Sequence, residues 1–134
     1  MSGTPEIFEK TITVKASDLD ELKHVNNVQY VQWIQDIAKE HWEKRASEEI
    51  LNTCFWVVIR HEIDYKQQAF LDDELIIQTF VGEHTHVTSQ RLVNILDKET
   101  KKVLVKAKST WCLMDYNTKK PVKISQEMLR VFYM

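Results

Sequence analysis

Hydrophobic and polar positions follow two different periods along this chain, and together they predict one long helix among several strands. Between residues 30 and 42 the positions suited to burial recur every three or four residues, which is the spacing of one helical stripe. The stripe consists of Tyr30, Trp33, Ile34, Ile37, Ala38, His41 and Trp42. Before it, residues 7–15 (IFEKTITVK) alternate imperfectly and favour a strand.

Four segments after the helix have the composition of long strands, because they are rich in β-branched and aromatic residues. They are CFWVVIRHEIDY (54–65), DELIIQTFVG (73–82), THVTSQRLVNILD (85–97) and KVLVKAKSTWCLMD (102–115). The connections VGEHTH and DKETKK are short, so neighbouring strands are expected to pair antiparallel, as hairpins in a four-strand meander. A short helix is expected near SQEMLRVFYM, at the end of the chain.

A single helix with one buried stripe needs a concave surface to cover that stripe. A long antiparallel sheet with right-handed twist can curl around it. The predicted fold is therefore α+β: a hotdog fold, with a long central helix wrapped by a curved antiparallel sheet of about five strands, as one domain over residues 1–134. The open sheet edge favours pairing with a second copy, so we expect a homodimer or homotetramer.

Composition excludes several classes of function. The chain has 134 residues, 43% of them hydrophobic, which is enough for a real core. A net charge of −2 argues against nucleic-acid binding, which needs an excess of clustered Lys and Arg. The N-terminal residues lack a signal-peptide core and no apolar run is long enough to span a bilayer, so we expect a cytoplasmic protein without a membrane partner. Cys54 and Cys112 lie within apolar runs and are expected to be small buried hydrophobes.

The segment SDLDELKHVNNVQYVQW (17–33) places acids, a histidine and two asparagines directly before the helix. Asn26 or Asn27 can cap the helix by accepting a hydrogen bond from a first-turn N–H group. Asp18 and Asp20 can interact favourably with the positive end of the helix dipole. His24 can be a structural hydrogen-bonding group. Residue chemistry alone leaves both a structural and a functional interpretation of this loop open.

This segment resembles the signature of hotdog thioesterases of the 4-hydroxybenzoyl-CoA thioesterase type and of their acyl-ACP and acyl-CoA thioesterase relatives. Their loop reads D-x-D-x-x-x-HVNN-x-x-Y-x-x-W. The matching residues are Asp18, Asp20, His24, Val25, Asn26, Asn27, Tyr30 and Trp33. A weaker resemblance continues through IDYKQQAFLDDELII and WCLMDYNTKKPVKIS. The resemblance implies a thioesterase for acyl groups on coenzyme A or acyl carrier protein, without a metal or redox cofactor.

The resemblance also implies roles for individual residues. In that family the second Asp acts as nucleophile or general base, which falls on Asp20 here, and the amide at the start of the central helix, here the Asn27 N–H, polarises the thioester carbonyl. A helix N-terminus suits this task because its free N–H groups and positive dipole end meet the negative charge that develops on the carbonyl oxygen. His24 matches the histidine thought to take part in catalysis. Asn26 and Tyr30 are predicted to contact the substrate.

The sequence departs from the family pattern in three places, and the full catalytic set of the plant-type enzymes is therefore incomplete here. Leu22 stands where plant-type acyl-ACP thioesterases have Asn, and Gln68 and Ala69 stand where those enzymes have a Glu-Cys pair. Lys23 precedes the HVNN signature, where many bacterial relatives have Gly. Lys23 can contact an anionic carrier or alter the approach of the backbone to the ligand. Gln68 can orient a water molecule by hydrogen bonding or be an exposed polar residue of the loop.

Two other functions fit the predicted fold. A hotdog dehydratase would need a histidine and a carboxylate facing each other across a dimer, whereas His24 and Asp20 share one loop, which favours hydrolysis. A non-catalytic protein that binds acyl-CoA or an acyl carrier is the second alternative. His84 and His86 resemble a metal-binding pair, but the sequence shows no third ligand, so no metal site is predicted. Acyl chain length stays open.

Overall fold

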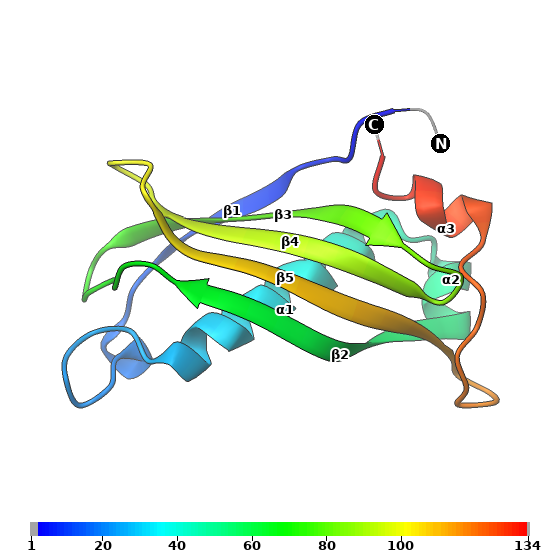
Figure 1. The fold of residues 1–134 in the computed structure, drawn as a ribbon, viewed down its shortest axis with the longest axis horizontal. Helices are drawn as coiled ribbons and strands as arrows, with labels where there is room; N and C mark the ends of the chain where they lie inside the picture. Colours follow the sequence, from blue (N-terminus) through cyan, green and yellow to red (C-terminus); the bar gives the residue numbers. More distant parts are fainter. Residues whose placement is uncertain (1–2, 134) are drawn as a thin grey trace.

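A long helix lies across the concave side of a curved antiparallel sheet in the computed structural model, which describes residues 3–133 (Figure 1). The elements are β1 (Phe8–Thr13), a 3-10 turn (Ala16–Asp18), α1 (Asn27–Arg45), α2 (Glu48–Thr53), β2 (Cys54–Tyr65), β3 (Glu74–His84), β4 (Thr88–Asp97), β5 (Val103–Asp115) and α3 (Gln126–Arg130). The predicted hotdog architecture, with its central helix and short C-terminal helix, is confirmed.

The strand order within the sheet is β1-β3-β4-β5-β2, with every neighbouring pair antiparallel. The two predicted hairpins, β3–β4 and β4–β5, are confirmed. The predicted four-strand meander is wrong at β2, which pairs with β5 instead of β3. The physical reason is that β1 already occupies the free edge of β3, with Phe8 opposite Thr79, while residues 66–73 are long enough to carry the chain across the sheet.

The helix α1 begins where its cap is, because Asn26 Oδ1 accepts a hydrogen bond of 2.9 Å from the Val28 N–H. Its buried residues are those of the predicted stripe. The short α2 was not predicted. Its signal lies in the sequence Ser47-Glu48-Glu49, since Ser47 Oγ caps the helix by accepting from the Ile50 N–H and the two acids lie in the first turn.

Two groups of buried side chains fill the space between α1 and the sheet. The larger group joins the first half of α1 to the inward-facing residues of β3, β4 and β5, including Leu75, Ile77, Val93, Ile95, Val105 and Ala107. The second joins Trp42 to α2, α3 and the ends of the strands. Cys54 and Cys112 are free thiols and are buried, as predicted. None of the helices within residues 3–133 is long and apolar enough to cross a membrane.

The arrangement places two different regions at the two ends of α1. The loop of residues 17–26 lies at the N-terminal end, and α2 and α3 lie at the C-terminal end (Figure 1). At a rise of 1.5 Å per residue, the helix axis advances roughly 22 Å over the fifteen steps from Asn27 to Trp42. The first region contains Asp20 and His24, and buried His41 and Arg91 lie towards the second.

Candidate active site

The loop before α1 is folded back on itself by its own backbone. The Asp20 N–H donates to the His24 carbonyl (2.9 Å), the Lys23 N–H donates to the Asp20 carbonyl (3.1 Å), and the Asn26 N–H donates to the Asp18 carbonyl (3.0 Å). Lys23 completes the turn in the left-handed region, with φ of 69°. The tight turn brings the side chains of Asp20 and His24 together at the start of the helix.

The Asp20 carboxylate is held in place but stays within reach of solvent. Its Oδ1 accepts a hydrogen bond of 2.9 Å from the Leu22 N–H, and its Oδ2 lies 3.2 Å from His24 Nδ1. The Asp20 and His24 side chains are 25% and 20% exposed. The contact between them has the distance of an ion pair but not the alignment of a hydrogen bond, and His24 Nδ1 is a buried nitrogen without a hydrogen-bond partner among residues 3–133.

The first turn of α1 offers one free backbone donor. The Val28 N–H is used by the Asn26 side chain, and the Gln29 N–H donates to the Asn26 carbonyl at 2.9 Å. The Asn27 N–H has no acceptor within the described part of the chain. This is the group predicted to polarise the thioester carbonyl. The Asn26 side chain is occupied by capping, so its predicted contact with substrate stays a prediction.

Tyr30 lies in the core and ties the next segment of chain to the loop. It is 2% exposed, and its hydroxyl accepts a hydrogen bond of 3.1 Å from the Ala69 N–H, while the Ala69 carbonyl accepts one of 2.9 Å from the Val25 N–H. Burial raises the pKa of Tyr30. The geometry gives Tyr30 a structural role, and its predicted contact with substrate stays untested. Gln68 is exposed in the same connection, beside the bridge between His24 and Phe70.

The remaining sequence candidates lie away from this loop. His84 ends β3 and His86 follows it in the hairpin to β4, and both are exposed. Among the described residues, no three His, Cys, Asp or Glu side chains are placed to hold a metal ion. His61 and His41 come from β2 and α1 and are at least partly buried.

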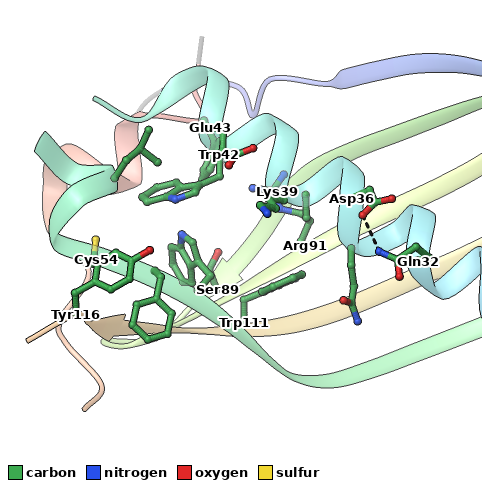
Figure 2. A pocket seen from close by; sticks show the side chains of 16 residues that line it. Gln32, Asp36, Lys39, Trp42, Glu43, Cys54, Ser89, Arg91, Trp111 and Tyr116 are labelled. Atoms are coloured by element: carbon green, nitrogen blue, oxygen red, sulfur yellow. Dashed lines mark hydrogen bonds between the residues drawn. The ribbon is translucent and has the colours of Figure 1, made fainter. Parts of the chain in front are cut away.

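A cavity of about 450 Å³ runs along α1 from Gln32 to Glu43, and its main polar group, Arg91, was not predicted from the sequence. Figure 2 shows Trp111, Ser89 and Arg91, which come from the sheet, facing the helix across this space. Arg91 is 6% exposed. The sequence signal was available: Arg91, Val93 and Ile95 alternate on the inward face of β4, so an inward arginine interrupts an apolar row.

Comparison with solved structures defines the fold class. YbaW, a probable thioesterase from Escherichia coli, is 22% identical with a TM-score of 0.85, and the match covers 94% of this chain and 98% of that one. Slr0204, a 1,4-dihydroxy-2-naphthoyl-CoA thioesterase from Synechocystis, is 15% identical with a TM-score of 0.81 and coverage of 94% and 95%. An acyl-ACP thioesterase from Bacteroides thetaiotaomicron is 21% identical with a TM-score of 0.79, and this chain covers 49% of it. The fold is that of the hotdog thioesterases.

The family follows from the sequence as a whole. The model of the acyl-ACP thioesterase N-terminal domain matches residues 5–132, nearly the full length. The chain belongs to this family and is a thioester hydrolase. No curated protein matches it.

Proposed function

We propose that the chain hydrolyses acyl thioesters of coenzyme A or of acyl carrier protein at the loop of residues 17–27. The observation that carries this proposal is the Asp20 carboxylate, partly exposed and held against His24 in the loop that leads into α1, whose Asn27 N–H has no acceptor within residues 3–133. Both carriers occur in the names of the similar structures, since the Synechocystis protein acts on a CoA thioester and the Bacteroides protein on acyl-ACP. The family match supports the reaction class.

The chemistry needs a group that attacks the carbonyl and a group that stabilises the oxyanion. The Asn27 N–H and the positive end of α1 supply the second, because negative charge builds on the carbonyl oxygen as the bond to the nucleophile forms. Asp20 supplies the first by one of two routes. It attacks the carbonyl itself, expelling the thiolate and leaving an anhydride that water cleaves, or it removes a proton from an attacking water.

His24 acts as a positioning group in this proposal. Its Nδ1 faces Asp20 Oδ2 at 3.2 Å and has no other partner within residues 3–133, so it can orient the carboxylate. Lys23 and Gln68 are exposed on the rim of the same region. We assign Lys23 to the anionic carrier and Gln68 to the orientation of water.

The proposal includes association into a homodimer or homotetramer, with each site shared between two copies. β2 forms one edge of the sheet, where Ile59 is 60% exposed and Tyr65 is 43% exposed. A two-fold axis that pairs two β2 edges antiparallel would set the end of one β2 beside the start of the other. The Asp20 loop of a second copy would then lie near the cavity of the first.

A thiol-release assay with a chromogenic reagent tests the proposal. Purified protein is offered a series of acyl-CoA esters from short to long chains, and the same acyl groups on acyl carrier protein. We expect steady turnover on part of this series, and the ratio of the two carriers identifies the natural one. A protein that binds acyl-CoA in equilibrium dialysis but releases no thiol from any ester on either carrier would refute the proposal.

A further inference from the structure

The cavity beside α1 has a cation in its wall that the protein does not neutralise. Within residues 3–133 the hydrogen bonds of the Arg91 guanidinium all use Nη1, which donates to His41 Nδ1 at 2.8 Å and to Thr79 Oγ1 at 3.3 Å. No carboxylate among these residues lies within 4.0 Å of it. The Nε and Nη2 donors are therefore left for another acceptor. One face of the guanidinium is covered by the Phe132 ring, 4.5 Å away.

Among the described residues, Arg91 is linked by hydrogen bonds to one carboxylate, that of Glu6, and only through the neutral ring of His41. Because Nδ1 of His41 accepts from Arg91, its Nε2 donates to Glu6 Oε1 at 2.7 Å. Burial lowers the pKa of His41 to about 4, so the ring is neutral at pH 7. Glu6 is already paired with Arg45 through two hydrogen bonds of 2.8 and 2.7 Å. Burial lowers the pKa of Arg91 to about 9, which still leaves it charged at pH 7.

Trp111 also lines the cavity and carries a donor that lacks an acceptor among the described residues. Trp111 Nε1 is buried and has no hydrogen-bond partner among residues 3–133. Trp111 lies opposite Ser89 in the pairing of β4 with β5, and Ser89 and Arg91 share one face of β4, so all three line the same space (Figure 2). A buried donor without an acceptor costs free energy, of the order of 1–3 kcal/mol, unless a ligand supplies one.

Aromatic rings and an open rim complete the cavity. Its apolar walls include Trp42, Phe55, Trp56 and Tyr116. The acids at its edge are turned to other contacts or to solvent: Asp36 accepts a hydrogen bond of 2.8 Å from Gln32 (Figure 2), and Glu43 is exposed. The volume of about 450 Å³ lies in the usual range of small-molecule pockets and accommodates a two-ring or medium-chain acyl group.

We infer that this cavity binds the acyl group of the substrate, and that this acyl group carries an anionic acceptor, a carboxylate, at the end far from the thioester, where Arg91 and Trp111 Nε1 bind it. The inference rests on the proposed function for the thioester end and adds the substrate class. A plain saturated chain would leave the guanidinium and indole donors unpaired. Because unpaired buried donors cost free energy, the site should bind such a chain more weakly. A carboxylate accepts from both.

Direct binding tests the cavity without any turnover. Isothermal titration calorimetry compares 2-naphthoate with 2-naphthamide, which has the same shape and no charge. We expect wild-type protein to bind the acid at least tenfold more tightly, and Arg91→Met to lose that preference while it still binds the amide. Arg130→Met, which removes the same charge from the exposed end of α3, is the matched control and should keep the preference. Equal binding of acid and amide by wild-type protein would overturn the inference.

Trp111→Phe is a second variant that tests the same site if Arg91→Met does not fold. It removes only the Nε1 donor and should weaken acid binding several-fold with no change for the amide; an unchanged acid affinity would contradict the assigned contact. Turnover then compares suberoyl-CoA with octanoyl-CoA, which differ by the terminal carboxylate. We expect a higher kcat/KM for suberoyl-CoA in wild-type protein, and a ratio at least tenfold lower in Arg91→Met. If neither ester is cleaved but the acid still binds through Arg91, the proposed function fails and the binding site stands.

Discussion

His24 Nδ1 is a buried nitrogen that has no hydrogen-bond partner within residues 3–133 and lies 3.2 Å from Asp20 Oδ2. If His24 orients that carboxylate, His24→Ala lowers kcat and leaves KM nearly unchanged, since the contact matters mainly in the transition state. The melting temperature should stay close to that of wild-type protein. His86→Ala, at an exposed position, is the control. A lower melting temperature together with normal specific activity would show that His24 is purely structural.

Lys23 adopts a backbone conformation that suits glycine, with φ of 69°. A side chain there costs roughly 1 kcal/mol because Cβ crowds the backbone. We expect Lys23→Gly to raise the free energy of unfolding by roughly 0.5–1 kcal/mol in urea titrations. Lys23→Ala removes the same charge but keeps Cβ, so it should bring no such gain. Equal stabilities for the two variants would contradict this account.

At the scale of elements, the period of the helix and of the inner strands could be read from the sequence. Every buried residue of α1 was predicted, because apolar residues spaced three and four apart lie on one face of a helix. The position of β2 could not be read, because an edge strand differs from a central one in its neighbours and not in its own composition. The helix α2 has six residues, too few to show a period. Its sequence signal is limited to the cap at Ser47 and the two acids that follow.

A chain of polar contacts, buried at His41 and Arg91, links the N-terminal segment, α1 and β4 and makes stability depend on pH. It runs from Arg45 and Glu6 through His41 of α1 to Arg91 of β4. Burial holds the pKa of His41 at about 4 in the folded chain, against 6.5 when exposed. Between pH 6.5 and 4 the unfolded chain binds a proton that the folded chain does not, so stability falls as the pH falls, by up to about 3 kcal/mol.

Glu6 extends this loss to lower pH. The hydrogen bonds from Arg45 lower its pKa from 4.5 to about 2, so its contribution is present above pH 4.5 and disappears as the pH falls towards 2. Urea titrations between pH 7.5 and 4 measure the histidine part. We expect His41→Gln, whose amide can keep both hydrogen bonds, to flatten the curve over this range, and the exposed His84→Gln to leave it unchanged. An undiminished slope in His41→Gln would show that other groups cause the acid lability.

At the scale of the whole molecule, the Asp20 loop precedes α1 and Arg91 of the cavity contacts His41 near the other end of the helix, so activity is expected to require two copies. Subunits with Asp20→Asn keep an intact cavity, and subunits with Ser89→Trp keep an intact loop. Each variant alone should be inactive, and mixed dimers should regain about one of the two sites. Light scattering checks the assembly. Inactive mixed dimers, or a monomer with full turnover, would refute the shared site.

The candidate site was only partly visible in the sequence. The loop motif identified Asp20, His24 and the start of α1 because these residues lie within eight positions of one another. The cavity could not be identified in the same way, because Trp42, Trp56, Arg91 and Trp111 come from four elements that only the sheet order brings together. Tyr30 matched the family motif, yet its hydroxyl is taken by the Ala69 N–H.

The central claim, that Asp20 performs the chemistry, is tested most directly by the kcat of Asp20→Asn measured beside that of Asp18→Asn. The first substitution keeps the size of the side chain but removes the nucleophile or base. The second affects a carboxylate whose Oδ2 accepts from the Lys15 N–H in a turn. We expect Asp20→Asn to fold and associate normally with a kcat more than tenfold lower, where each tenfold step corresponds to about 1.4 kcal/mol, and Asp18→Asn to be much milder. A kcat for Asp20→Asn above about a tenth of the wild-type value, or equal losses in the two variants, would contradict the claim.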